Sequence, residues 1–126
     1  MNKFKVLLVD DEEELVMALA ERLHLRGVET SVAYSGEQAL HMLHDEDPDV
    51  LLLDLKMPGM DGLEVLRRVK KAHPPIQVVI LTGHGSDQDA ESARRLGAFG
   101  YLRKPVDINE LVLTLNHAYQ HKLAEV

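Results

Sequence analysis

Polar residues follow four strand-like segments of the sequence, at the point where each apolar run ends. Asp10 and Asp11 follow the first run, Asp54 the third, Thr82 the fourth and Lys104 the fifth. The carboxyl ends of parallel strands meet at one edge of a sheet, so we expect these side chains to converge in one crevice. The site would then combine clustered carboxylates with one hydroxyl and one ammonium group.

The clustered carboxylates require a counter-charge. At roughly 4 Å and an effective dielectric near 20, two carboxylates repel each other by on the order of 4 kcal/mol. A proton or a cation must offset this repulsion. Because the set offers oxygen ligands and neither His nor Cys, the residues indicate a hard cation such as Mg²⁺ (or Mn²⁺).

The same residues suit the transfer of a phosphoryl group. A divalent ion would neutralise charge that develops on the phosphoryl oxygens. Lys104 would add a point charge, and Thr82 would donate its hydroxyl to a phosphate oxygen. Asp54 can then attack phosphorus in line and form an aspartyl phosphate. Its own stretch fits a loop-capping role equally well, and the coincidence of the five residues favours the functional interpretation.

The stretch around Asp54 predicts how this residue is positioned. The apolar residues Val50–Leu53 predict a strand that is buried on both faces. The Pro-Gly pair that follows suits the centre of a type II turn, with Gly59 at positive φ. Asp61 and Glu64 have the spacing of a helix N-cap and its reciprocal acid. We therefore expect a carboxylate held rigidly where a central strand leaves its sheet.

Apolar runs and helical periodicities alternate along the whole chain, 1–126, which we expect to be a single domain. Strands are predicted at 5–9, 28–34, 50–53, 76–81 and 99–102, and helices, with their caps, at 12–26, 35–43, 63–71, 86–96 and from 107. In the first helix, Leu15, Ala18, Leu19 and Leu23 have the spacing of a buried face. The alternation predicts an α/β fold, a flavodoxin-like (βα)5 three-layer sandwich with a five-stranded parallel sheet in the order 2-1-3-4-5.

Composition and charge exclude several classes of protein. The 126 residues include no cysteine, so disulfides and thiolate metal sites are excluded. The formal net charge of −7 argues against direct nucleic-acid binding by this domain. No apolar run is long enough to span a bilayer, and the N-terminus lacks a signal-peptide core. We therefore expect a cytoplasmic protein that makes no membrane contact.

The motifs around the site resemble those of a known family. They are Asp10-Asp11 after the first strand, LLLDLKMPGMDG around Asp54, ILTG with Thr82, and GAFGYLRKP with Lys104. In this order and spacing they resemble the receiver domain of two-component response regulators, over residues 4 to 120. The resemblance implies a phosphorylatable signalling switch and not an enzyme, since the domain would assist only its own phosphorylation and dephosphorylation.

The resemblance also implies a role for each acid of the site. Asp54 would be the phosphoacceptor and a metal ligand. Asp11 would bind Mg²⁺ directly, whereas Asp10 would act largely through water. The backbone carbonyl of Lys56 would complete the protein ligands.

Further roles follow from the resemblance at the ends of the fourth and fifth strands. Thr82 and Lys104 would contact the phosphoryl group, and Pro105 would follow a cis peptide bond. Tyr101 would be an aromatic switch residue that turns inward when the Thr82 hydroxyl moves to the phosphate. On its residue type alone, Tyr101 is a half-buried strand aromatic. The movement would rearrange the surface of the fourth helix, fifth strand and fifth helix.

Two flanking positions, Lys56 and His84, are expected to tune the phosphoryl lifetime by governing water access. We expect the Lys56 side chain to stay near the phosphoryl oxygens, because it is long and close to a concentrated anion. His84 could act as a weak acid or base, although an exposed loop histidine is the simpler interpretation.

Partners follow from the resemblance too. The phosphoryl group would come from a sensor histidine kinase or a phosphotransfer protein, and the signal would pass to a downstream protein or an output domain. A phosphorylation-dependent dimer is compatible with this function.

Three alternative functions fit the fold. They are an adaptor receiver that is never phosphorylated, an aspartyl-phosphate-forming hydrolase, and a flavin carrier. Such hydrolases commonly have a second acid where this chain has Lys56. A flavin carrier would need a glycine- and hydroxyl-rich loop where this chain has Asp-Asp-Glu-Glu-Glu.

Overall fold

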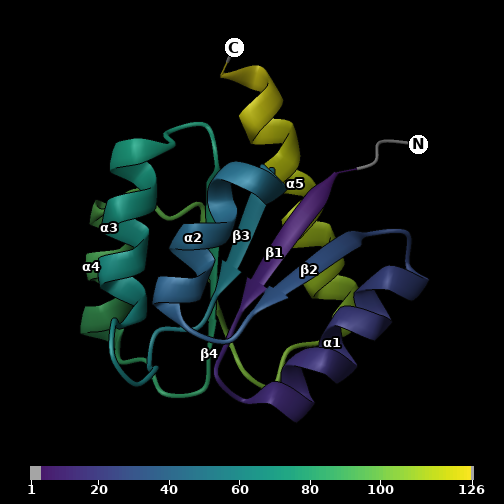
Figure 1. Cartoon of the computed structure of the whole chain (residues 1–126), viewed down its shortest axis with the longest axis horizontal. Coiled ribbons are helices and arrows are strands. Elements are labelled where there is room, and N and C mark those ends of the chain that lie inside the picture. Colours follow the sequence, from purple (N-terminus) through teal and green to yellow (C-terminus); the bar gives the residue numbers. More distant parts are fainter. Residues whose placement is uncertain (1–3, 126) are drawn as a thin grey trace.

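The computed structural model describes residues 4–125 as strands and helices that alternate along the chain (Figure 1). The strands are β1 (Lys5–Val9), β2 (Glu29–Ala33), β3 (Val50–Leu53), β4 (Gln77–Thr82) and β5 (Gly100–Arg103). The helices are α1 (Glu13–Leu25), α2 (Gly36–Glu46), α3 (Gly62–Ala72), α4 (Asp87–Arg95) and α5 (Ile108–Ala124). All strand pairs are parallel, and the sheet order is β2-β1-β3-β4-β5. The predicted fold class and strand order are confirmed.

The helices cover both faces of the sheet and enclose two apolar cores. One core packs side chains of α2, α3 and α4, such as Leu43, Leu66 and Ala93, against the sheet. The other core packs α1 and α5 against the opposite face, with Leu23 and Leu115 fully buried. Figure 1 shows the same division, with α2, α3 and α4 on one side of the strands. Sheet residues alternate between the two cores, as the two-residue period of a strand requires.

The central position of β3 fixes the geometry of the site edge. Val50–Leu53 has no exposed residue, whereas most residues of the edge strand β2 are partly exposed. Leu53 pairs with Val9 of β1, so the residues after these two strands are neighbours. The amide of Asp54 accordingly donates to the carbonyl oxygen of Val9 at 3.0 Å. The ladder thus continues one residue past the end of β3 and holds Asp54 in register.

The turn and cap after β3 largely follow the prediction. Gly59 has a φ of 78°, as a type II turn requires. The Asp61 side chain accepts from the amide of Glu64 at 3.0 Å and begins α3. The prediction that Glu64 bonds back to the amide of Asp61 is wrong. The Glu64 carboxylate instead pairs with Arg67 and Arg68, at 2.6 and 2.7 Å.

Two expectations for the helices are also wrong. Leu15 is 58% exposed, and the neighbouring Val16 is buried against the sheet in its place. Helix α2 continues to Glu46, beyond the predicted end, and stops where Asp47 adopts the left-handed conformation with a φ of 45°. A left-handed residue is a common helix terminator, and an Asp tolerates it better than most residues.

A second polar cluster ties together the opposite, amino-terminal edge of the sheet. The Asp49 carboxylate accepts from the backbone amide of Lys5 at 2.9 Å and pairs with the Lys122 ammonium at 2.5 Å. Lys5 also donates from its ammonium group to the carbonyl oxygen of Glu46. One carboxylate therefore joins the start of β1, the start of β3 and the last turns of α5.

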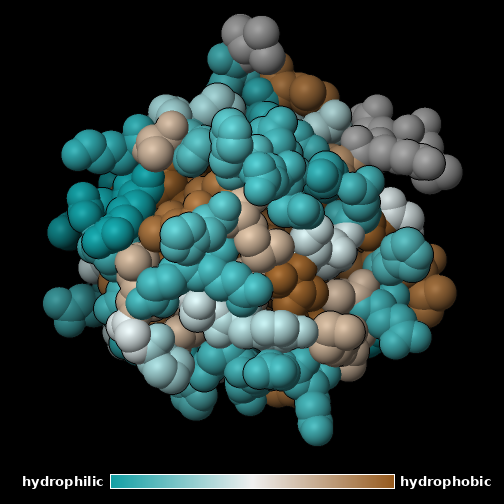
Figure 2. Space-filling view, in the orientation of Figure 1, coloured by the Kyte–Doolittle hydropathy of each residue, from teal (hydrophilic) through white to brown (hydrophobic). Residues whose placement is uncertain are grey.

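The outer surface is mostly polar. Figure 2 shows one face of the molecule, on which hydrophilic side chains predominate and apolar patches lie between them. Large apolar side chains such as Leu25, at 76% exposed, occur on the helices. Within residues 4–125, no helix has the length and apolar character needed to cross a membrane.

Candidate functional site

The structure brings the three predicted acids together at the carboxyl edge of the sheet. Carboxylate oxygens of Asp10, Asp11 and Asp54 all lie within 4.8 Å of one another. Asp10 and Asp54 are buried, at 5% and 3% exposed, whereas Asp11 is accessible to solvent. The cluster thus has two buried carboxylates and one facing water, which is an arrangement that an ion can enter from outside.

The first residue of α3 packs directly against the main chain of Asp54 and Leu55. The amide of Gly62 donates to the carbonyl oxygen of Leu55 at 2.8 Å. A Cβ atom on Gly62 would lie 2.3 Å from the carbonyl oxygen of Asp54 and 2.6 Å from Cα of Leu55. Only glycine permits this approach, so the first residue of α3 fixes the backbone that carries the carboxylate.

Lys104, the residue after β5, contacts the acids. Its ammonium group donates to Oδ2 of Asp10 at 2.6 Å and lies 3.8 Å from Oε1 of Glu12. Burial opposes its charge, but the hydrogen bond to Asp10 and the surrounding carboxylates together raise the pKa of Lys104 above its ordinary value. Lys104 is therefore positively charged at neutral pH. The peptide bond between Lys104 and Pro105 is cis, as predicted.

The surroundings of Asp54 disfavour its charged form. Burial, and to a smaller extent the charge of Asp10, raises the pKa of Asp54 above the ordinary value of 3.8, although the hydroxyl of Thr82 and the charge of Lys104 act in the opposite direction. Its Oδ1 atom is buried and has no hydrogen-bond partner among residues 4–125. A buried carboxylate oxygen without a donor is costly. This oxygen is available for a cation or an electrophile.

The donor set of the cluster fits a hard divalent cation. All three side chains offer carboxylate oxygens, and one of these oxygens is unpartnered within the described chain. Oxygen donors of this kind suit Mg²⁺ or Mn²⁺ better than softer metals. The residues present therefore fit the ion that the sequence predicts.

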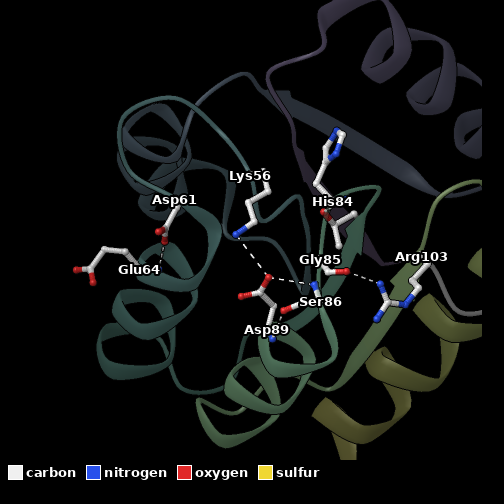
Figure 3. A network of polar contacts seen from close by, with 9 residues as sticks. Lys56, Asp61, Glu64, His84, Gly85, Ser86, Asp89 and Arg103 are labelled. Carbon is white, nitrogen blue, oxygen red and sulfur yellow. Dashed lines mark hydrogen bonds and ion pairs between the residues drawn. The ribbon is translucent and has the colours of Figure 1, made fainter.

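Thr82 lies beside the acids at the end of β4 and is fully buried. Its hydroxyl oxygen accepts from the amide of His84 at 3.2 Å, and its carbonyl oxygen accepts from the amide of Lys104 at 2.9 Å. The His84 side chain is exposed, and it points away from the other polar groups of the loop in Figure 3. The structure thus brings Thr82 and Lys104 together and leaves the His84 ring in solvent.

The Lys56 side chain lies against the first turn of α4. Its ammonium group is 3.5 Å from Oδ2 of Asp89, in the first turn of α4 (Figure 3). Asp89 also accepts from the amide of Ser86 and thereby completes the capping box of that helix. In the unmodified protein the Lys56 side chain therefore contacts α4, and its place near the phosphoryl oxygens stays a prediction. Its influence on phosphoryl lifetime stays a prediction.

Tyr101 already lies inward in the unmodified protein, against the loop between β4 and α4, so this placement does not require a phosphoryl group. Its hydroxyl oxygen is buried and has no partner among the residues that the structure describes. Burial raises the pKa of this phenol, against the opposing charge of Arg103. The Arg103 guanidinium carbon lies 5.5 Å from the centre of the tyrosine ring.

Three residues of this region, Gly85, Asp89 and Arg103, were not predicted from the sequence to belong to the site. The Gly-His-Gly run followed by Ser86 and Asp89 was the available signal, because it predicts a tight loop that leads into a capping box. Arg103 had no signal of its own, since a charged residue at a strand end is normally solvated.

Comparisons with known proteins agree with this geometry. A family model for the response regulator receiver domain matches residues 6–116. Sporulation initiation phosphotransferase F of Bacillus subtilis is 40% identical over 111 residues, which cover 88% of this chain and 89% of that protein. The DNA-binding transcriptional regulator NtrC of Escherichia coli strain K12 is 40% identical over 96% of this chain. The chain spans about a quarter of NtrC, 26% of its length.

Solved structures show the same likeness. A receiver domain protein from Clostridium thermocellum superimposes with a TM-score of 0.92 at 36% identity, over 98% of this chain and 99% of that one. A CheY-like receiver domain protein from Methanospirillum hungatei JF-1 gives a TM-score of 0.93 at 25% identity, over 99% of this chain and 100% of that one.

An open parallel sheet with an acidic pocket at its carboxyl edge is the architecture of a signalling receiver module. The chain belongs to the response regulator receiver domain family. Receivers of this family accept a phosphoryl group on an aspartate in two-component signal transduction.

Proposed function

We propose that this domain accepts a phosphoryl group on Asp54 and passes on the resulting conformational change as a signal. One observation carries the proposal: three carboxylates meet within 4.8 Å beside the Lys104 ammonium, and the Asp54 carboxylate keeps one buried oxygen without a partner. A structural cap would have no need of an unpaired oxygen. A nucleophile requires one.

The chain's own residues support each part of the transfer. The free oxygen of Asp54 attacks phosphorus in line, and the bond from phosphorus to its donor breaks as the donor leaves with the electron pair. Lys104 moves its ammonium from Asp10 toward a phosphoryl oxygen, and Thr82 donates its hydroxyl to another. Hydrolysis removes the phosphoryl group. Water attacks phosphorus, the bond between phosphorus and Asp54 breaks, and the products are the free Asp54 carboxylate and inorganic phosphate.

Asp10, Asp11 and Asp54, with the backbone carbonyl of Lys56, would hold one Mg²⁺ or Mn²⁺ ion. When bound, the ion offsets the repulsion among the carboxylates and the charge on the phosphoryl oxygens. Asp11 is the accessible member of the set and would meet the ion first, whereas Asp10 is already engaged with Lys104.

The donor of the phosphoryl group would be a phosphohistidine on a sensor kinase or a phosphotransfer protein. The relative named sporulation initiation phosphotransferase F, of which the chain covers 89%, supports a place in a chain of phosphoryl transfers. The longer NtrC relatives are DNA-binding transcriptional regulators, which supports an output that acts on transcription. Size-exclusion chromatography with and without acetyl phosphate tests whether the domain dimerises on phosphorylation.

Phosphorylation would act through Thr82 and would stabilise Tyr101 in the place against Gly85 that its ring already occupies in the unmodified protein. A phosphoryl group adds nearly two negative charges, which draw the Thr82 hydroxyl and Lys104 toward it. The Thr82 methyl group and the Tyr101 hydroxyl both lie against Gly85, in the loop that leads to α4. The surface formed by α4, β5 and α5 would therefore change its packing.

Incubation with acetyl phosphate in Mg²⁺ buffer, followed by intact-mass measurement, tests the proposal. Wild-type protein should gain one phosphoryl group, and the gain should be lost in EDTA and in Asp54→Asn. Asp61→Asn is the matched control, because Asp61 is an exposed helix cap and Asn is an equally good cap. An unmodified wild-type chain would favour the adaptor alternative, and steady turnover of a generic phosphomonoester would favour the hydrolase.

A further inference from the structure

Arg103 links the end of β5 to the loop between β4 and α4. It pairs with Thr82 in the β4–β5 ladder and immediately precedes Lys104. Its guanidinium donates to the carbonyl oxygen of Gly85 at 2.5 Å and to the carboxylate of Asp87 at 3.0 Å. Figure 3 shows the side chain reaching across to Gly85. A single side chain thus fastens the loop that follows Thr82 to the strand that precedes Lys104.

The same guanidinium lies against the Tyr101 ring, with 5.5 Å between its central carbon and the ring centre. At this distance a cation attracts the face of an aromatic ring. The Tyr101 hydroxyl is buried and lacks a partner within residues 4–125, so the ring is not held there by a hydrogen bond from its own oxygen. Contacts around the ring must hold it in place, and Arg103 contacts both the ring and the loop.

Because Gly85 has no side chain, the hydroxyl of Tyr101 can occupy the space beside its Cα atom. A Cβ atom on Gly85 would lie 1.6 Å from Oη of Tyr101 and 2.9 Å from Cγ2 of Thr82. Gly85 is not among the glycines with positive φ, so the backbone conformation alone would accept another residue. The lack of a side chain is needed for space, because any larger residue would collide with the tyrosine hydroxyl. We call this placement of Tyr101, with its hydroxyl against Gly85 and Thr82, the inward position.

We propose that Arg103 is a positioning residue that clasps the β4–α4 loop over Tyr101. It holds Tyr101 in the inward position and keeps Thr82 next to the acidic cluster. The holding of the ring is a property of the unmodified protein. Its effect on phosphoryl acceptance rests on the function proposed above, because a loop that is already in place has less to reorganise during transfer.

Fluorine NMR of protein labelled with 3-fluorotyrosine tests the clasp without any phosphoryl donor. The sequence has three tyrosines, Tyr34, Tyr101 and Tyr119, and Tyr101→Phe identifies the signal of Tyr101 by its loss. In Arg103→Ala, the ratio of outward to inward Tyr101 should rise by about tenfold, since both the ring contact and the loop bonds are lost. The other two signals should stay in place.

Arg103→Lys keeps the charge but lacks the fork that reaches two acceptors, so it should displace the Tyr101 signal by an intermediate amount. Arg95→Ala is the matched control, because Arg95 is an arginine of α4 whose Nε atom lies 3.4 Å from Oε1 of Glu91 in the same helix. Its spectrum should equal that of the wild type. A Tyr101 signal that is unchanged in both Arg103 variants would overturn the proposal.

Gly85→Ala is an independent check of the inward position. The added methyl group should expel Tyr101 while Arg103 is intact, and the Tyr101 signal should move toward its solvent-exposed value. If Gly85→Ala leaves the signal unchanged, the ring is not under this loop and the proposal fails. Circular dichroism confirms that each variant is folded, and Arg103→Lys provides the measurement if Arg103→Ala does not fold.

A double-mutant cycle connects the clasp to phosphoryl acceptance. Arg103→Ala should slow phosphorylation by acetyl phosphate about tenfold in the wild-type background and less than about twofold in a Tyr101→Ala background. Equal factors in the two backgrounds would show that Arg103 does not act through Tyr101 and would overturn the proposal. Wild-type protein that takes up no phosphoryl group would instead contradict the proposed function, and the NMR result would still decide the clasp.

Discussion

Replacing Asp54 by Asn should stabilise the fold in buffer that contains a chelator. Asp54 is 3% exposed, and its carboxylate lies within 4.8 Å of those of Asp10 and Asp11. Asparagine keeps the size of the side chain and removes its charge. The substitution therefore relieves the cost of burying a carboxylate as well as its repulsion from the two neighbouring acids.

The magnitude follows from the distances in the cluster. Two unit charges 4.8 Å apart repel by about 3.5 kcal/mol at an effective dielectric of about 20. Lys104, 2.6 Å from Asp10, offsets much of the repulsion from that residue, and solvent screens the accessible Asp11. We therefore expect a net gain of roughly 1–3 kcal/mol in the free energy of unfolding. For a chain of this length, each kcal/mol corresponds to about 3–5 °C in Tm.

The gain should depend on pH in one direction. The pKa of Asp54 is raised above 3.8 in the folded protein, mainly by burial. Protonation of such a group favours the fold, so its contribution to stability is lost as the pH rises through the raised pKa. Asp54→Asn cannot titrate. The stability difference between variant and wild type should therefore grow as the pH increases from about 4 to about 7.

Urea denaturation in EDTA, followed by circular dichroism, measures the effect. Asp61→Asn serves as the control and should leave stability unchanged, since this exposed acid only caps α3. Adding Mg²⁺ at about ten times its Kd should stabilise the wild type by about 1.4 kcal/mol and the variant by less. An Asp54→Asn protein that is no more stable than the wild type in EDTA would refute this account of the cluster.

Three further changes test other parts of the structure. Gly62→Ala should lower the free energy of unfolding by about 2 kcal/mol or more in urea denaturation, because its Cβ would lie 2.3 Å from the carbonyl oxygen of Asp54; unchanged stability would contradict the close approach. Asp49→Asn should cost about 1–2 kcal/mol by breaking the partly buried pair with Lys122, and a Lys122→Met background should remove most of that cost. Lys56→Ala should change the dephosphorylation rate of the aspartyl phosphate, whereas identical rates of phosphate release would dispose of a lifetime role.

The strand order and the gathering of the site residues could be predicted from the sequence. Apolar runs such as Val50–Leu53 identify buried parallel strands, and the topology of such a sheet then fixes where the following residues meet. The convergence of Asp10, Asp54 and Lys104 needed no knowledge of side-chain contacts. The residue types alone gave the chemistry of the pocket, because only oxygen donors and one ammonium group are present.

Contacts between side chains of different elements could not be predicted in this way. Leu15 and Val16 are adjacent on α1, and the choice of which one is buried depends on how the helix is rotated against the sheet. The Lys56 side chain has several rotatable bonds and can reach either the pocket or α4. It lies by Asp89 because the capping box already holds that carboxylate in place. Such choices depend on three-dimensional neighbours that no local pattern encodes.

The close approach of Gly62 to the peptide after β3 determines which side of the pocket can move when Asp54 is phosphorylated. The α3 side of the pocket consists of main-chain atoms in direct contact, which leave little room to yield. The facing side is joined by side-chain bonds from Arg103 and Lys56, which can break and re-form individually. Phosphorylation should therefore displace α4 and β5, while α3 keeps its position against the sheet.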